Sequence, residues 1–236
     1  MKDVFVADAH LADPDAENFH RFLDFLDGLH GQTRTLFLLG DIFEFWVGYR
    51  HVVFAPYVPV LDALRRLKEA GTEIVYVEGN HDFHLGPWFE KTLGARILPD
   101  GGEVTVDGQR LLVVHGDLID PSDSGYRLLR RLLRSRPFRV LKSLIPPDWA
   151  WAIARWGSRQ SQKKHSSYNR SRKVEEMVSS YGEKKLAEGF DGVVSGHFHT
   201  AFIRPSDSGT IVALGDWIDQ YSYAVLEDGV FTLESY

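Results

Sequence analysis

The chain of 236 residues contains no cysteine, and this absence excludes several classes of protein. Without thiols there is no disulfide framework, no thiolate zinc site and no cysteine nucleophile. Long hydrophobic runs are absent too, since no stretch approaches the roughly 20 apolar residues that a membrane-spanning helix requires. At its start, Met1-Lys2-Asp3-Val4 leads directly into a predicted strand instead of a long apolar signal segment. These absences favour a soluble cytoplasmic protein.

Acidic and basic residues are distributed unevenly along the chain. The net charge is −6, but residues 126–173 hold 14 of the 27 Lys and Arg residues and only one acid, Asp148. With 44% hydrophobic residues, the length suits one domain with an insertion better than two independent domains. We therefore predict a single domain over residues 1–236, with a basic amphipathic helical cap inserted at residues 120–173.

Short apolar runs alternate with segments of helical periodicity in the first hundred residues. The pairs are residues 4–7 with 16–29, 35–39 with 58–70, and 74–77 with 88–93. This alternation is typical of a layered α/β fold. The Asp107-Gly108 dipeptide predicts a tight hairpin between residues 103–106 and 110–114, because it tolerates positive φ angles. Further strands, at residues 210–214, 221–226 and 230–233, predict a second sheet packed on the first.

Five apolar runs end on residues that bind metal ions. These ends are Asp8-Ala9-His10, Gly40-Asp41, Gly79-Asn80-His81-Asp82, His115-Gly116-Asp117 and Gly196-His197-Phe198-His199. Strands that stop at one edge of a sheet deliver the following side chains to a shared site. Carboxylate, amide and imidazole groups suit divalent cations, and two ions about 3.5–4 Å apart need a bridging ligand. We predict that two ions share the following ligands: Asp41 as the bridge, Asp8, His10 and His199 at one site, and Asn80, His115 and His197 at the other.

These motifs, in this order, resemble those of the calcineurin-like metallophosphoesterase superfamily. The resemblance covers nearly the whole predicted body and implies an α/β protein with a four-layer α/β/β/α sandwich, here with a helical cap inserted. It also implies an enzyme in which a metal-bound hydroxide attacks phosphorus, so that no protein nucleophile is required. The ligand set accepts Mn²⁺, Fe, Zn²⁺ or Mg²⁺, and its histidine content favours Mn²⁺.

His81 lies next to the predicted ligand Asn80. The resemblance implies that His81 faces the substrate, where an imidazolium would protonate the leaving oxygen or stabilise the transition state. We therefore predict that His81 is catalytic and that Asp82 orients it. Asn80 and His81 are also predicted to contact the substrate.

The residues that flank these motifs narrow the resemblance. The chain is similar to the UDP-2,3-diacylglucosamine pyrophosphohydrolase family of lipid A biosynthesis in its basic insertion and in three segments, Asp41–Trp46, Gly79–Gly86 and Asp123–Arg127. Members of that family cut a pyrophosphate to give lipid X and UMP, and a nucleotide-linked glycolipid is therefore the implied substrate. The resemblance also implies further substrate contacts at Asp123, Tyr126, Arg159 and Ser161. The chain departs from the family at His81, where the best-matched enzymes carry Arg.

The basic insertion is predicted to form short helices at residues 126–134, 137–144 and 149–156, because prolines separate these segments. Apolar residues alternate there with Arg and Lys, which gives helices that are both apolar and cationic. This combination suits an anionic membrane surface, so we expect peripheral contact with the cytoplasmic face of the inner membrane and acyl chains between the helices. The alternative is that the apolar faces pack on the body while the arginines face solvent.

Two other functions stay open at this point. A basic surface also binds polyphosphates, so a nucleotide phosphodiesterase or nuclease of the same superfamily is the second candidate. Against it, the aromatic residues cluster with aliphatic ones and do not alternate with basic residues as in a stacking platform. A non-catalytic scaffold that retained a metal site is the third candidate. The sequence also leaves the oligomeric state open.

Overall fold

The first strand is apolar on both of its faces, and this determines the layering of the protein. The computed structural model describes residues 1–142, 144–152 and 168–236. In strand β1 (Lys2–Val6), Val4 and Val6 belong to one hydrophobic core and Phe5 belongs to another. A strand with apolar residues on both faces is buried on both sides. β1 therefore lies between two packed layers.

Two sheets pack face to face around the core that contains Phe5. The larger sheet has the strand order β13-β12-β1-β2-β4-β6, and the smaller one has the order β10-β11-β9-β8-β7. Besides β1, the larger sheet contains β2 (Thr33–Leu38), β4 (Glu73–Val77), β6 (Arg96–Leu98), β12 (Ser222–Glu227) and β13 (Val230–Ser235). The smaller sheet contains β7 (Gly102–Val106), β8 (Gln109–Val114), β9 (Gly192–Ser195), β10 (Ala201–Ser206) and β11 (Gly209–Leu214).

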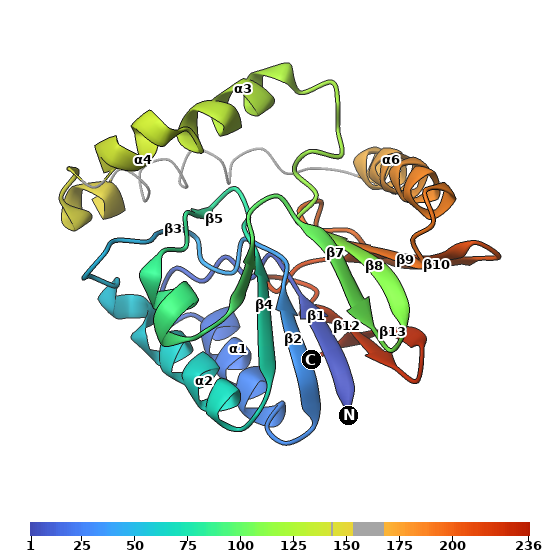
Figure 1. The fold of residues 1–236 in the computed structure, drawn as a ribbon, viewed down its shortest axis with the longest axis horizontal. Coiled ribbons are helices and arrows are strands. Elements are labelled where there is room, and N and C mark those ends of the chain that lie inside the picture. The colour runs from blue at the N-terminus through green and yellow to red at the C-terminus, as the bar shows by residue number, and fades with distance from the viewer. Residues whose placement is uncertain (143, 153–167) are drawn as a thin grey trace.

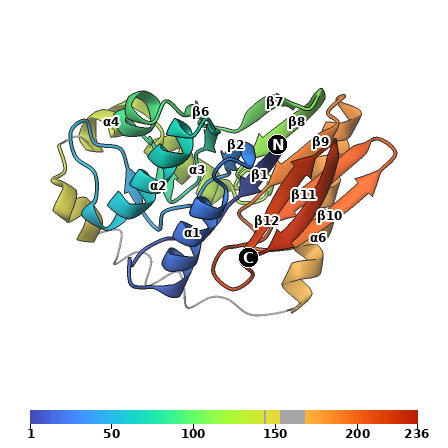
Figure 2. The same ribbon diagram turned by 90° about the horizontal axis from the view of Figure 1, so that it is seen from below.

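Helices cover the outer face of each sheet (Figures 1 and 2). Helices α1 (Glu17–Gly28) and α2 (Val58–Glu69), with the short turns η1 (Ala55–Tyr57) and η2 (Trp88–Thr92), cover the larger sheet. On the smaller sheet, Val178 and Leu186 of α6 (Tyr168–Ala187) pack against Ile211. The order of layers is therefore helix, sheet, sheet, helix, which confirms the predicted four-layer α/β/β/α sandwich.

The structure confirms one part of the predicted strand pattern and differs from it in two others. The hairpin between β7 and β8 is confirmed, with positive φ angles at Asp107 (49°) and Gly108 (80°). The last two strands, however, join the larger sheet beside β1, whereas β11 lies in the smaller one. The sequence also gave no sign of β10, because Pro205 interrupts its pattern; β10 is an edge strand, where proline is tolerated.

Two helices of the basic segment lie across one end of the sandwich (Figure 1). Helices α3 (Ser124–Leu133) and α4 (Arg136–Lys142) confirm two of its predicted elements, and residues 147–152 are also helical. They lie above the short parallel strands β3 (Trp46–Val47) and β5 (Asp82–Phe83). Tyr49 donates a hydrogen bond from its hydroxyl to the carbonyl of Ile145, 3.0 Å away. No helix among the described residues is long and apolar enough to cross a bilayer.

Candidate metal centre

The ends of parallel strands bring the predicted ligands to one edge of the sandwich. β1, β2 and β4 are parallel in the larger sheet, and β8 and β9 are parallel in the smaller one. Backbone hydrogen bonds join the loops that follow, from His10 N–H to the carbonyl of Asp41 and from Gly196 N–H to that of His115. A Cβ atom on Gly79 would lie 2.1 Å from Asp41 Oδ1, so only glycine allows this approach.

Three of the predicted ligands surround one point. Asp8 Oδ1 lies 3.6 Å from His199 Nε2 and 3.9 Å from His10 Nε2. These atoms are too far apart for hydrogen bonds but close enough to coordinate a common ion.

The other predicted ligands surround a neighbouring point. His115 Nε2 lies 3.5 Å from Asp41 Oδ2, 3.0 Å from Asn80 Oδ1 and 3.2 Å from His197 Nδ1. Asp41 Oδ2 is also 3.8 Å from His10 Nε2, in the first group. This oxygen therefore lies between the two groups, as a bridging ligand requires. The structure thus brings together all seven residues that were predicted to bind metal.

The donor atoms of this centre fit divalent cations. Asp8 Oδ1 and His10 Nε2 are buried and have no hydrogen-bond partner among the described residues. The ring of His115 is fixed by a hydrogen bond of 2.8 Å between Nδ1 and the carbonyl of Leu39. Because a carbonyl only accepts, Nδ1 carries a proton, and Nε2, directed toward Asp41 and His197, is the nitrogen that would bind an ion. Unpaired buried acceptors that converge in this way are stabilised by a cation.

Burial and mutual interactions strongly perturb the protonation of these groups. Desolvation raises the pKa of Asp8, whose carboxylate is fully buried. Desolvation lowers the pKa of His10, but Glu44, Asp41 and Asp8 outweigh it and raise that pKa to about 9. In the metal-free chain, protons on the histidines therefore supply part of the positive charge that cations supply in a loaded site.

The backbone of the centre adopts an unusual conformation. Five predicted ligands have positive φ angles: Asp8 (54°), His10 (45°), Asp41 (53°), His197 (74°) and His199 (52°). Residues other than glycine rarely adopt this region, and each such residue costs on the order of 1–3 kcal/mol. Concentration of this strain at one edge of the fold is typical of a functional site.

Asp82 braces the turn that carries Asp41. Its buried carboxylate accepts hydrogen bonds from the N–H groups of Asp41 (2.9 Å) and Gly79 (3.0 Å) and from the hydroxyl of Tyr76 (2.6 Å). We predicted that Asp82 orients His81. These hydrogen bonds instead direct the Asp82 carboxylate at the turn.

Glu44 makes the orienting contacts instead. His81 Nδ1 lies 2.8 Å from the Glu44 carbonyl, and His10 Nδ1 lies 3.2 Å from Glu44 Oε2. One residue thus contacts a predicted ligand and the predicted catalytic residue. Glu44 belongs to none of the predicted ligand or catalytic sets, although a single acid within the apolar run Ile42–Trp46 is a signal for a buried polar role.

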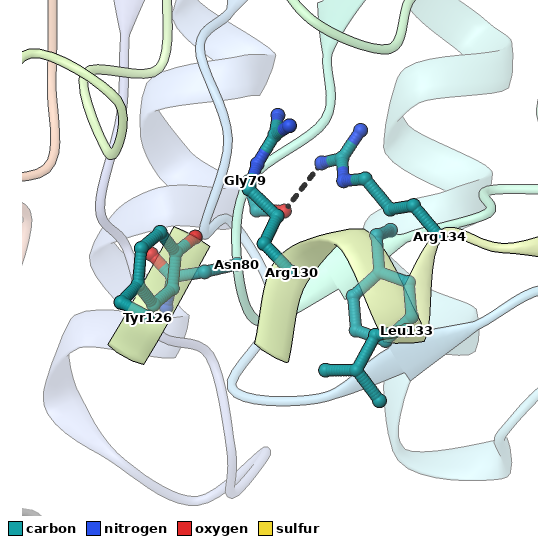
Figure 3. Close-up of a pocket in the computed structure, with 7 residues that line it drawn as sticks. Gly79, Asn80, Tyr126, Arg130, Leu133 and Arg134 are labelled. Carbon is teal, nitrogen blue, oxygen red and sulfur yellow. Dashed lines mark hydrogen bonds between the residues drawn. The ribbon is translucent and has the colours of Figure 1, made fainter. Parts of the chain in front are cut away.

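Helix α3 and Arg134, the residue that follows it, face the metal centre with side chains at four-residue intervals. Tyr126 Oη donates to Asp117 Oδ2 (2.5 Å), and Arg130 Nε donates to the same oxygen (2.6 Å). Arg134 donates to the carbonyl of Gly79 (3.0 Å), directly before Asn80 (Figure 3). The helix is thereby tied to two metal-site loops. Neither Arg130 nor Arg134 was singled out by the sequence, although their spacing places them on one helix face with Tyr126.

The predicted substrate contacts are placed only in part. Tyr126 lines a pocket with Asn80, Arg130 and Arg134, as Figure 3 shows. Asp123 caps the N-terminus of α3 by accepting a hydrogen bond from the N–H of Tyr126, at 2.9 Å. Arg159 and Ser161 lie outside the described residues.

Comparison with protein families identifies the class. The family model described as calcineurin-like phosphoesterase matches residues 1–201, and the chain belongs to this family. It is accordingly a metal-dependent phosphoesterase. An archaeal phosphodiesterase of solved structure aligns over 100% of both chains with a TM-score of 0.52 and 14% identity, which supports the fold.

Two curated relatives carry a more specific name. The chain is similar to the UDP-2,3-diacylglucosamine hydrolase of Chromobacterium violaceum, with 31% identity over 95% of this chain and 94% of the relative. It is also similar to the protein of the same name from Haemophilus influenzae, with 29% identity over 92% of this chain and 91% of that relative.

We expect replacement of the buried Asp8 carboxylate to raise the melting temperature without metal and to lower it, relative to the wild type, with metal. Without metal, Asp8→Asn should raise the melting temperature by about 3 °C at pH 8, which corresponds to about 1 kcal/mol for a chain of this size. The gain should shrink at pH 5, because the raised pKa of Asp8 means that its carboxyl is then largely neutral. With excess Mn²⁺ the wild type should melt higher, because the variant has lost a ligand.

Thermal melts of both proteins check this prediction. Asp15→Asn, at an exposed acid on the same chain, is the matched control and should leave the melting temperature unchanged under all conditions. An Asp8→Asn variant that is stabilised by Mn²⁺ as much as the wild type would remove Asp8 from the ligand set.

Proposed function

We propose that this protein hydrolyses the pyrophosphate bond of UDP-2,3-diacylglucosamine and releases lipid X and UMP. The observation that carries the proposal is the combination of a dinuclear ligand set with a cationic, apolar cap docked beside it. Support also comes from relatives named UDP-2,3-diacylglucosamine hydrolase that align with more than nine-tenths of the chain. In this proposal, residues 1–236 form one domain and residues 120–173 are its inserted cap.

Two divalent ions at this centre would act as Lewis acids that neutralise phosphoryl oxygens and activate water. We propose Mn²⁺ as the ion in both sites, because four histidine nitrogens accompany the oxygens of Asp8, Asp41 and Asn80. Asp41 would bridge the ions, and the strained loops would hold all ligands in place before substrate binds.

The specific substrate is tested by direct competition between substrate classes. The Mn²⁺-loaded protein should release UMP from UDP-2,3-diacylglucosamine and leave single-stranded DNA intact, with bis(p-nitrophenyl) phosphate as a general control for phosphodiester hydrolysis. Hydrolysis of DNA without release of UMP would favour the nuclease alternative. No hydrolysis of any of the three compounds would favour a scaffold.

We propose that His81 acts on the leaving group. Its Nδ1 atom lies 2.8 Å from the Glu44 carbonyl, so Nδ1 carries a proton and Nε2 is the atom that exchanges a proton with a bound substrate. The side chain is 27% exposed, unlike that of His115 at 1%. His81 is therefore accessible to a ligand, and it is held by a contact that does not involve the ions.

Replacement of this imidazole separates catalysis from metal binding. His81→Ala should lower turnover by a factor of about 10², a typical contribution of general acid catalysis, while two Mn²⁺ ions remain bound. Metal analysis and initial rates provide the measurement. His20→Ala, at an exposed histidine of α1, serves as the matched control. An unchanged rate for His81→Ala would exclude His81 from catalysis.

We further propose that the cap contacts the cytoplasmic face of the inner membrane. Helix α3 has no buried residue, and three of its leucines, Leu128, Leu129 and Leu132, are more than half exposed. The apolar cap face consists of side chains that are 51–74% exposed: Leu128, Leu129, Leu132, Val140, Leu141, Leu144 and Trp149. Arg127 and Arg131 accompany these residues. Exposed apolar residues beside arginines are suited to anionic lipid surfaces.

A cavity beside the cap offers space for part of the lipid. It has a volume of about 1100 Å³, comparable with the largest sites for small molecules. Its lining includes apolar residues of the cap and of the body, such as Leu144, Ile145, Val52 and Ile97. Arg134 borders both this cavity and the pocket next to Asn80. We propose that acyl chains lie on this side of the protein.

Binding to vesicles tests the membrane contact. The wild type should bind vesicles that contain phosphatidylglycerol more tightly than pure phosphatidylcholine vesicles, and 0.5 M salt should weaken this binding. Leu128→Ser combined with Leu132→Ser should weaken it at least about tenfold, because each buried leucine contributes on the order of 1.5 kcal/mol or more.

The matched control for this double variant is Val230→Ser. Val230 is 64% exposed on β13, at a distance from the cap in the fold. Its replacement should leave vesicle binding unchanged. Equal binding by the wild type and the double variant would show that the apolar cap face does not enter the membrane.

A further inference from the structure

A sixth strand end reaches the metal centre without supplying a predicted ligand. β11 runs parallel to β9 and ends at Leu214, and the next residues are Gly215 and Asp216. This Gly-Asp pair repeats the pattern of Gly40-Asp41 after β2. Asp216 is only 4% exposed, and its Oδ2 atom lies 3.7 Å from His199 Nδ1. The carboxylate therefore lies on the side of the imidazole that faces away from Asp8, whose Oδ1 is 3.6 Å from Nε2.

The loop of Asp216 fixes this carboxylate firmly. Oδ1 accepts hydrogen bonds from the N–H groups of Ile218 (2.9 Å), Asp219 (2.8 Å) and Gln220 (3.2 Å). Oδ2 accepts a hydrogen bond of 2.7 Å from Gln220 Nε2. A carboxylate that accepts this many hydrogen bonds is held as an anion in one orientation.

The same loop also holds the backbone at both ends of the first ligand group. Gln220 Nε2 donates to the carbonyl of His199 at 2.9 Å, and the N–H of Trp217 donates to the carbonyl of Asp8 at 3.1 Å. Contacts with the side chain and with the main chain of His199 therefore come from a single loop. That loop is also attached to Asp8, which is predicted to bind the same ion as His199.

We propose that Asp216, assisted by Gln220, is a positioning residue that sets the tautomer and orientation of His199 for metal binding. The carboxylate attracts the proton of the imidazole to Nδ1, so that Nε2 presents its lone pair toward Asp8 Oδ1. The separation of 3.7 Å is an ion-pair distance and is longer than a hydrogen bond. The inference rests on the proposed metal site and is independent of the proposed substrate.

The side chain of His199 is more exposed than those of His10 and His115, two other histidines of the centre. The side chain of His115 is 1% exposed and is enclosed by the protein, whereas that of His199 is 32% exposed. Its backbone also has a φ angle of 52°, a conformation that surrounding contacts must maintain. The contacts from Asp216 and Gln220 supply this restraint at the open side of the metal centre.

Asp216→Asn distinguishes positioning of His199 from a purely structural role. The amide keeps one oxygen that can accept the three N–H groups of the loop, which retains most of the hydrogen bonds that hold the loop. Its NH₂ group then replaces Oδ2 and can accept neither the imidazole proton nor the hydrogen bond from Gln220 Nε2. We expect one of the two Mn²⁺ affinities to fall about 10- to 100-fold, as is typical when the partner of a metal-binding histidine is lost. The other affinity and the melting temperature of the metal-free protein should stay near their wild-type values.

The measurement is titration of the metal-free protein with Mn²⁺ in competition with a chelating dye. Asp219→Asn, at the exposed neighbouring acid, is the matched control and should leave both affinities unchanged. In a double-mutant cycle, Asp216→Asn should have no further effect on Mn²⁺ affinity in a His199→Ala background, because the two residues act through the same ligand.

Three results would overturn the inference. The first is an Asp216→Asn variant that binds two Mn²⁺ ions as tightly as the wild type. The second is an equal loss at both sites together with a lower melting temperature of the metal-free protein, which would indicate a structural role. The third applies if Asp216→Asn does not fold and Gln220→Ala is tested in its place. It is a Gln220→Ala variant with unaltered Mn²⁺ affinities. Wild-type protein that binds no Mn²⁺ would instead refute the proposed metal site, and the inference with it.

Discussion

The structure depends on one electrostatic constraint, the placement of two buried carboxylates at the same edge of the fold. Asp8 and Asp41 are both almost fully buried and both approach the ring of His10. Like charges in a region of low dielectric constant repel each other unless a cation lies between them. The surrounding loops, with their strained backbones, hold the carboxylates against this repulsion. Much of the architecture around the strand ends can be understood as support for this arrangement.

That support is arranged in successive layers of contacts. The Asp82 carboxylate holds the turn that carries Asp41, Glu44 holds His10, and the Leu39 carbonyl holds His115. Beyond them, α3 is attached to the loops of the centre through its arginines. The cap is therefore not an independent appendage. Its position and the geometry of the metal-site loops are physically connected by these hydrogen bonds.

The sequence was sufficient to predict the central architecture and the group of ligands that converge. Parallel strands all end at one edge, so a motif such as Gly79-Asn80-His81-Asp82 after an apolar run indicates both a strand and a site. The assignment of strands to sheets was less accessible. β12 pairs with β1 and β13 pairs with β12, and the first of these pairings joins residues more than 200 positions apart. Local patterns contain no information about such pairing.

The residues that support the ligands were the least predictable part of the site. Glu44 and Asp216 act through hydrogen bonds and ion pairs that exist only after distant loops have packed together. For the same reason, Asp82 was expected beside His81, its neighbour in sequence, whereas its carboxylate contacts the turn of Asp41. Proximity along the chain is a poor guide to the direction of a buried side chain.

The uneven distribution of charge gives the molecule a permanent electric dipole. Residues 124–142, which contain α3 and α4 at one end of the sandwich, include seven Arg and Lys residues and no acid, whereas the remaining chain carries −13. A negatively charged surface exerts a torque on such a dipole before contact is made. A protein molecule that approaches such a surface would thus turn its cap toward the surface. A larger share of collisions would then occur in this one orientation.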